Sequence, residues 1–182
     1  MPATGPQLET ERLILRQWRR DDFPRYAEMF AHPATAHIGG PLVVGDAWRR
    51  FLQMPGAWSM QGFAMFAIED KATGLFVGQA GPWQPEGWPG TEVGYALHPD
   101  GWGRGYATEA CIAAMDWAFD VLEWSEVIHS IDPANTASQA VARRLGATLR
   151  GPGVFPAPLD SKVIAIWGQS RDEWRARRGG SR

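Results

Sequence analysis

A glycine-rich segment between a strand pattern and a helix pattern constrains the fold of this chain more than any other feature. Residues 91–97 (TEVGYAL) are predicted to form a strand, residues 100–105 are rich in glycine, and a long helix is expected from Tyr106. Glycines permit positive φ and let backbone N–H groups crowd inward, and the positive end of the following helix also attracts anions. The segment therefore predicts a phosphate-binding loop in an α/β domain.

Two nucleotide-binding motifs fit this loop poorly. The dinucleotide fingerprint requires a third glycine where the chain has Tyr106, and an acidic residue about 20 residues further on, where the nearest candidate, Asp132, lies too far along. The nucleoside-triphosphate loop requires Gly-Lys-Ser/Thr, which the sequence lacks. A turn with only a structural role remains the alternative interpretation.

Length and charge limit the remaining classes. The chain has 182 residues, is 45% hydrophobic, and carries 18 Lys plus Arg against 20 Asp plus Glu, a formal net charge of -2. Its basic residues are scattered except in residues 175–182, which argues against nucleic acid as a partner. We expect one domain over residues 1–182, with a core at about 8–174 and flexible tails at 1–7 and 175–182.

A single cysteine, Cys111, excludes a disulfide within the chain and a zinc site built on several thiolates, and it fits a reducing, cytoplasmic location. Residues 1–9 have neither a basic start nor an apolar run, and no later stretch approaches the roughly 20 apolar residues that span a bilayer. We therefore expect a soluble protein with no membrane partner and no metal. Cys111 lies on the apolar stripe of the helix after the loop, where a core role is expected.

The rest of the chain predicts strands interspersed with four helices, an α/β or α+β domain built on a single sheet. The strands are expected at residues 12–18, 63–69, 75–80, 91–97, 127–131, 147–154 and 162–168, and the last two are expected to pair at a sheet edge. The helices are expected at residues 21–30, at 44–51 with Pro55-Gly56 as its end, from Tyr106, and from an Asn135 or Thr136 cap to Gly146.

Four motifs, in this order along the chain, are similar to one known family. They are TERLILR at residues 10–16, EVGYAL at 92–97, GRGYATEA at 103–110 and N-x-x-S at 135–138. Together they resemble the GNAT superfamily of N-acetyltransferases, and within it the Rim-type branch of ribosomal-protein N-terminal acetyltransferases and their relatives. The resemblance implies a mixed, mainly antiparallel sheet that is split by a V-shaped cleft between the strands at 91–97 and 127–131.

The resemblance also implies acetyl-coenzyme A as the co-substrate in this cleft. Its pantetheine arm would pair with the strand near Leu97 and contact Asn135, and the Ala96 N–H would face the oxyanion. Its pyrophosphate would lie on a loop made of Trp102, Gly103, Arg104, Gly105, Tyr106, Ala107 and Thr108. Trp102 departs from the family pattern, which has a polar residue at that position, so its phosphate contact is open.

The implied reaction is direct attack of a primary amine on the thioester in a ternary complex. Attack requires a neutral amine, whereas an α-amino group titrates at about 8 and a lysine at about 10.4, so a base is expected. Glu92 is the predicted base, with His98, His129 or water as alternatives. Many relatives use a tyrosine as acid where this chain has Ala142, and Ser138 is then the nearest hydroxyl to the leaving sulfur.

The acceptor is left open between a protein N-terminus and a small molecule, and monomer and homodimer are equally open. Three tryptophans, Trp58, Trp83 and Trp88, are predicted to line the acceptor pocket, with His32 and His37 in its wall. Two rival functions are a non-catalytic acyl-coenzyme A binding module and an unrelated nucleotide-binding domain. The presence of Glu92 and Ser138 favours an enzyme.

Overall fold

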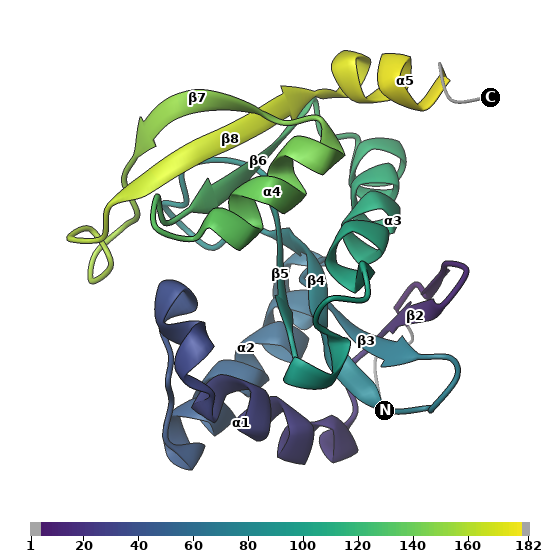
Figure 1. Cartoon of the computed structure of the whole chain (residues 1–182), viewed down its shortest axis with the longest axis vertical. Coiled ribbons are helices and arrows are strands. Elements are labelled where there is room, and N and C mark those ends of the chain that lie inside the picture. Colours follow the sequence, from purple (N-terminus) through teal and green to yellow (C-terminus); the bar gives the residue numbers. More distant parts are fainter. Residues whose placement is uncertain (1–4, 180–182) are drawn as a thin grey trace.

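One eight-stranded sheet runs through the computed structural model, which describes residues 5–179 (Figure 1). The strands lie in the order β1-β2-β3-β4-β5-β6-β8-β7, and every neighbouring pair is antiparallel except β5 and β6. They are β1 (Leu8–Glu9), β2 (Leu13–Arg16), β3 (Phe66–Asp70), β4 (Phe76–Trp83), β5 (Glu92–Leu97), β6 (Glu126–Ile131), β7 (Thr148–Gly153) and β8 (Ile164–Ser170). The predicted mixed sheet, with β7 at one edge, is confirmed.

Five α-helices and three short 3-10 helices occur within the described residues. They are α1 (Phe23–Ala31), α2 (Val44–Gln61), α3 (Tyr106–Asp120), α4 (Thr136–Leu145), α5 (Arg171–Gly179), η1 (Arg20–Asp22), η2 (Pro33–Ile38) and η3 (Pro99–Gly101). None of the helices in this part of the chain has the length and apolarity that crossing a membrane requires.

Two helix layers enclose the sheet (Figure 1). On one face, α1 and α2 pack through Tyr26, Phe30 and Phe51 against β3, β4 and β5. On the other face, the small side chains of α3, Ala107, Ala110, Cys111, Ala114 and Ala118, lie against the buried residues of β2, β4 and β5. Small residues let this helix approach the sheet closely, as its composition predicted.

The end of α2 corrects one prediction. The helix was expected to stop at Pro55-Gly56, yet it continues through Pro55 and ends at Gly62, whose φ is 80°. Trp58, in the added turn, contacts the rings of Phe66 and Trp117 at 5.1 Å and 5.8 Å. Burial of this indole outweighs the hydrogen bond that proline removes from the helix.

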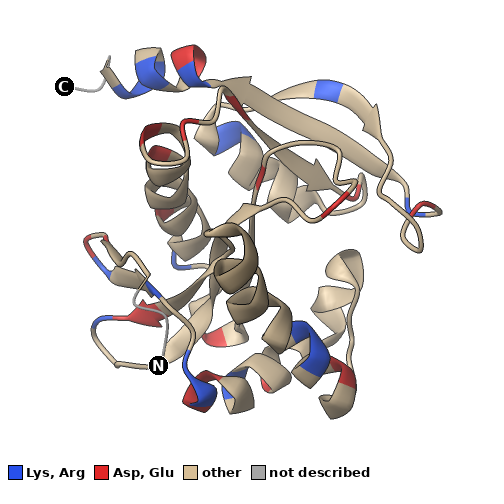
Figure 2. Ribbon diagram, turned by 180° about the vertical axis from the view of Figure 1, so that it is seen from behind, with Lys and Arg blue, Asp and Glu red and all other residues tan. Residues whose placement is uncertain are grey.

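The C-terminal segment is also more ordered than expected. Residues 175–179 were predicted to belong to a flexible tail, but they complete α5, whereas residues 1–4 and 180–182 lie outside the described part of the chain. Trp174 is buried and donates its indole N–H to Asp116 of α3 at 2.7 Å, and Arg178 pairs with the same carboxylate at 2.9 Å. Figure 2 shows that α5, next to the C-terminus, carries charges of both signs.

The sheet opens between β5 and β6. Their register contains a single pair, Glu92 with Ile128, and the Ile128 N–H donates to the Thr91 carbonyl at 2.9 Å. Beyond this point the two parallel strands separate, which leaves the backbone of β5 without a strand partner on that side. The predicted split of the sheet is therefore confirmed at the predicted strands.

Candidate active site

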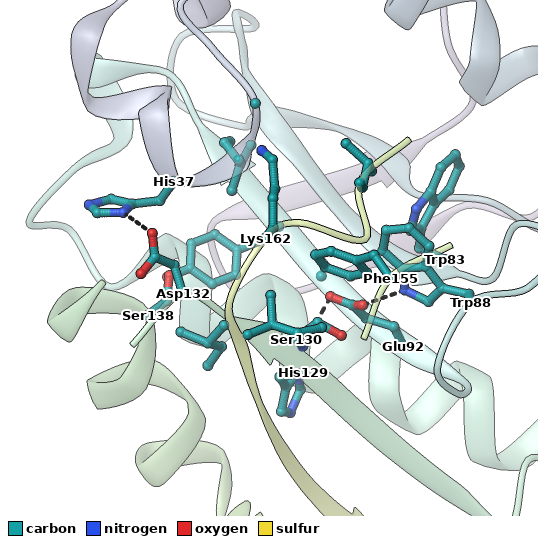
Figure 3. A pocket seen from close by; sticks show the side chains of 18 of the residues that line it. His37, Trp83, Trp88, Glu92, His129, Ser130, Asp132, Ser138, Phe155 and Lys162 are labelled. Carbon is teal, nitrogen blue, oxygen red and sulfur yellow. Dashed lines mark hydrogen bonds and ion pairs between the residues drawn. The ribbon is translucent and has the colours of Figure 1, made fainter. Parts of the chain in front are cut away.

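A cavity of about 1040 Å³ lies where β5 and β6 diverge (Figure 3). Its walls come from β5, the end of β6, the first turns of α4, the segment from η2 into α2, and the loop between β7 and β8. Segments far apart in the sequence therefore meet around one opening, with helices of both layers at its rim. This is the kind of concave site in which open mixed sheets bind their ligands.

Glu92 lies at the base of this cavity and is 8% exposed. Its Oε2 accepts a hydrogen bond from the Trp88 indole at 2.6 Å, and its Oε1 accepts one from the Ser130 N–H at 3.3 Å. No cation among the described residues offsets the burial, which raises the pKa of Glu92 to about 7. A carboxyl group that titrates near neutrality can accept a proton at physiological pH.

We expect Glu92→Gln to change stability in a pH-dependent way. Because burial raises the pKa of Glu92 from 4.5 to about 7, the folded chain keeps a proton that the unfolded chain has already lost between these values. The free energy of unfolding of the parent therefore falls as the pH rises through this window, by on the order of 3 kcal/mol. Urea unfolding should show similar stability of the two proteins at about pH 4 and a more stable variant at about pH 8. A difference in the free energy of unfolding between the two proteins that does not change with pH would contradict the raised pKa of Glu92.

A pair of hydroxyl groups lies across the opening from α4 to β5. The Tyr95 hydroxyl and Ser138 Oγ are 3.0 Å apart, and both residues line the cavity. Ser138 is positioned by Asn135, whose Oδ1 accepts the Ser138 N–H at 3.0 Å and so caps α4 as predicted. The sequence analysis did not identify Tyr95 as a site residue, although it lies within the EVGYAL motif. The alternation along β5 indicates which face of the sheet Tyr95 occupies, but it does not indicate that the side chain contacts α4.

The direction of the β5 amides corrects one predicted contact. His98 donates its N–H to the Val77 carbonyl of β4, whereas the Val93 carbonyl accepts from His129 of β6. Successive amides of a strand point to opposite sides, so the Ala96 N–H faces β4 and cannot face the opening. The amides of Tyr95 and Leu97 face the opening instead, and either can take the role that was predicted for Ala96.

The glycine-rich loop has the backbone geometry expected of an anion site. Gly103 and Gly105 have φ values of 69° and 79°, and no side chain caps the start of α3. The first-turn N–H groups of α3 are therefore directed outward without an intrahelical partner. The Trp102 indole instead donates to the Leu97 carbonyl at 2.9 Å, and its ring meets His32 edge to face at 4.9 Å. Trp102 thus packs on the loop, and its ring N–H is already engaged.

Side chains of the loop are turned back toward the protein. Arg104 and the Tyr106 hydroxyl both donate to Asp70 Oδ2, at 3.0 Å and 2.9 Å, and Asp70 is 1% exposed. Glu109 of α3 accepts the Arg12 N–H at 2.9 Å and the Arg12 Nε at 2.7 Å. The TERLILR motif therefore holds α3 and its loop against the sheet, so Glu109 has a structural role.

The four histidines are placed differently relative to the cavity, and two of them line it. His129 is buried and its Nδ1–H donates to the Val93 carbonyl at 2.7 Å, while burial lowers its pKa and keeps the ring neutral. His98 lies outside the cavity lining, against Arg25 and Asp100. His37 lines the cavity and contacts Asp132 at 2.8 Å. Of the predicted wall residues only His37 is placed there, since His32 caps η2.

Two of the three predicted tryptophans line the cavity. Trp88 stacks on Phe155 at 4.4 Å, and Trp83 meets Trp88 edge to face at 6.5 Å (Figure 3). Trp58 is absent from the lining, because its ring is 8% exposed in the core and its N–H donates to the Met65 carbonyl. The structure therefore does not support an acceptor contact for Trp58.

Cys111 belongs to the cavity lining but is buried, and burial raises the pKa of its thiol to about 12. The thiol is thus protonated at neutral pH, in keeping with the core role predicted for it. Within residues 5–179, no group of three or more His, Cys, Asp or Glu side chains is arranged to hold a metal ion.

Comparison with known proteins identifies the family to which this site belongs. Residues 12–148 match the acetyltransferase (GNAT) domain. The chain is 30% identical to the uncharacterised N-acetyltransferase p20 of Bacillus licheniformis over 72% of this chain and 76% of that one. It is 40% identical to the uncharacterised protein YkkB of Bacillus subtilis over 47% of this chain, and the match spans about half (51%) of YkkB. The chain belongs to the GNAT acetyltransferase family.

Solved structures agree with this assignment. An acetyltransferase from Agrobacterium tumefaciens superimposes with a TM-score of 0.81 and 33% identity, over 91% of this chain and 95% of that one. A ribosomal-protein-serine acetyltransferase fold from Vibrio cholerae superimposes with a TM-score of 0.77 and 22% identity, over 93% and 99% of the two chains. The predicted family is confirmed, and the fold is shared with Rim-type members.

Proposed function

We propose that the protein transfers the acetyl group of acetyl-coenzyme A directly to a primary amine. The observation that carries the proposal is the position of Glu92, a buried carboxyl group with a pKa of about 7 at the point where β5 and β6 separate. The family supports acetyl transfer in general, and the single cysteine supports a cytoplasmic location.

The residues that would hold acetyl-coenzyme A form a continuous path along β5 and into α3. The outward amides of Tyr95 and Leu97 offer hydrogen bonds to the peptide-like pantetheine arm, as does the side-chain amide of Asn135. The amides of residues 103–108 suit the pyrophosphate, because glycine at 103 and 105 leaves the backbone open to it. When bound, acetyl-coenzyme A supplies an activated acyl group and a thiolate leaving group.

Glu92 and the hydroxyl pair lie on opposite faces of β5. Residues 92, 94 and 96 share one face, and Ala96 on that face packs with Tyr26 and Phe30 of α1. Tyr95 points to the other face, where it meets Ser138 of α4. An amine that enters from the side of α1 and α2 therefore meets the base, while the sulfur lies on the side of the hydroxyls.

The chemistry then follows from these positions. Glu92, when ionised, accepts a proton from the amine, and the neutral nitrogen forms a bond to the acyl carbon. The N–H of Tyr95 or Leu97 stabilises the negative charge on the acyl oxygen. As the carbon–sulfur bond breaks, Ser138, which is hydrogen-bonded to the Tyr95 hydroxyl, donates its proton to the leaving sulfur. The nitrogen gives up its remaining extra proton to water and Ser138 regains one from water, so that an amide and a free thiol are formed. A thiolate with a pKa of about 8.5 needs little help, so this contribution is modest.

We expect Ser138→Ala and Tyr95→Phe to lower kcat by a similar, modest factor of roughly tenfold, because each breaks the same pair. The double variant should be no slower than the slower single variant, since groups that act as a unit are not additive. Steady-state kinetics with saturating acetyl-coenzyme A checks this, and Thr136→Ala, in the same turn of α4, is the control. Full activity of both single variants would show that the thiolate leaves unaided.

A non-catalytic acyl-coenzyme A binding module is the second candidate, since the loop alone suffices for binding. The two are separated by following thiol release from acetyl-coenzyme A with peptides and small amines offered side by side. The names of the structural neighbours favour including protein N-termini among the acceptors. Amine-dependent thiol release supports transfer, whereas tight binding of coenzyme A with no release from any acceptor supports the binding module.

A further inference from the structure

Two cationic side chains of the cavity form no ion pair within the described part of the chain. Arg50 of α2 and Lys162 of the β7–β8 loop both line it, and within residues 5–179 no carboxylate lies at ion-pair distance (4.0 Å) from either. Arg49, the third cation of the lining, differs because it pairs with Asp46. A guanidinium carries five N–H donors, and Arg50 uses one of them on the Ile38 carbonyl at 2.7 Å.

The two cations meet at one point beside η2. A Cβ atom placed on Gly39, which follows η2 with φ of 90°, would lie 3.1 Å from Arg50 Nη1 and 3.9 Å from Lys162 Nζ. Figure 3 shows Lys162 extending across the cavity toward this segment, beside Phe155. A ligand atom next to Gly39 would therefore contact both positive charges, and the missing side chain leaves the space for it.

Three of the four carboxylates in the cavity lining are already engaged. Asp132 accepts from His37 at 2.8 Å and is also attracted by the more distant charge of Lys162, Asp46 pairs with Arg49, and Glu92 accepts from Trp88. Burial lowers the pKa of Arg50, as expected for a cation that leaves water without an opposite charge beside it. Such a group binds an anion more strongly than an exposed one does, because little solvation remains to be lost.

We propose that the acceptor amine carries a carboxylate, which Arg50 and Lys162 bind beside Gly39, and an apolar group that lies against Trp83, Trp88 and Phe155. This inference rests on the proposed function and names the acceptor class of the same site. Two sources share this chemistry, an amino-acid-like small molecule and a protein N-terminus followed by an acidic side chain. Arg50 and Lys162 are then specificity-determining residues that touch the acceptor.

Binding of matched probes tests the proposal without acetyl transfer. With coenzyme A present, calorimetry compares indole-3-propionate with its neutral amide, and the C-terminally amidated tripeptide Ala-Trp-Glu with amidated Ala-Trp-Gln, so that one member of each pair carries a carboxylate and the other carries none. We expect the carboxylate member of at least one pair to bind roughly tenfold more tightly, in line with charge-assisted hydrogen bonds. A preference in the first pair alone indicates a small acceptor, and one in the second pair alone indicates a protein N-terminus.

Variants assign that preference to its residues. Arg50→Met and Lys162→Met should each remove most of it, whereas Arg49→Met, on the same helix and already paired with Asp46, should preserve it. The Lys162 side chain lies on an exposed loop and makes no hydrogen bond within the described residues, so Lys162→Met tests the proposal even if Arg50→Met does not fold. The proposal is overturned if neither carboxylate probe binds more tightly than its neutral counterpart, or if Lys162→Met and a folded Arg50→Met both keep the preference. Because calorimetry measures probe binding and does not require acetyl transfer, it tests this proposal even if no acetyl transfer is found.

Discussion

Glu92→Gln is expected to lower kcat by about 10²- to 10⁴-fold, the usual cost of removing a general base. In the parent, kcat/KM should rise with pH through about 7, because only the ionised carboxylate accepts a proton and burial raises the pKa of Glu92 to about 7. Glutamine keeps an oxygen for the Trp88 indole but cannot accept the proton. The variant should therefore lose both rate and this limb of the pH profile, while its affinity for acetyl-coenzyme A is unchanged.

Glu86→Gln is the matched control, since Glu86 lines the same cavity but is exposed. Rates of thiol release between about pH 5.5 and 9 provide the comparison, a span that includes the pKa of Glu92 and that of an α-amino group. A Glu92→Gln enzyme with the parent's rate and pH profile would assign the proton transfer to water or to His129.

Gly105→Val is expected to weaken acetyl-coenzyme A binding by roughly tenfold or more, a loss of at least about 1.4 kcal/mol. Gly105 precedes α3 with φ of 79°, and its bare backbone leaves room for phosphate at the uncapped helix start. A Cβ at this position would lie 3.4 Å from Arg12, an ordinary contact, so the protein itself can accommodate the side chain.

The positive φ also costs stability when valine replaces glycine, by roughly 1–2 kcal/mol. Gly62→Val separates this effect, because Gly62 has nearly the same φ, 80°, with open space around it, but follows the end of α2 instead of preceding the start of α3. Both variants should lose similar stability, and only Gly105→Val should lose affinity by calorimetry. Unchanged affinity of a folded Gly105→Val protein would remove the loop from the binding site.

Short-range sequence signals predicted the parts of the fold that are determined by backbone preferences within a few residues. The strand, glycine-rich loop and helix around residues 91–120, the Asn135 cap and the Gly146 end of α4 all follow from backbone preferences within a few residues. The end of α2 could not be predicted in this way, because its last turns depend on Trp58 reaching Phe66 and Trp117, which are distant in sequence.

The candidate site likewise contains residues that local motifs identify and residues that only the tertiary structure reveals. Glu92 and Ser138 were identified from motifs, and the cavity brings both to its lining. The Tyr95 contact, the paths of the β5 amides and the cations Arg50 and Lys162 all depend on tertiary placement of segments that periodicity treats separately. Trp58 illustrates the opposite error, since an indole in a helix can belong to a core as readily as to a pocket.

A crystal structure of the protein with acetyl-coenzyme A tests the central claim most directly. The account predicts the pantetheine arm between β5 and β6 on the amides of Tyr95 and Leu97, with the pyrophosphate on the amides of residues 103–108. The thioester should lie between Glu92 and the Ser138 hydroxyl. Electron density for the coenzyme along another edge of the sheet, or a thioester remote from both residues, would contradict the account.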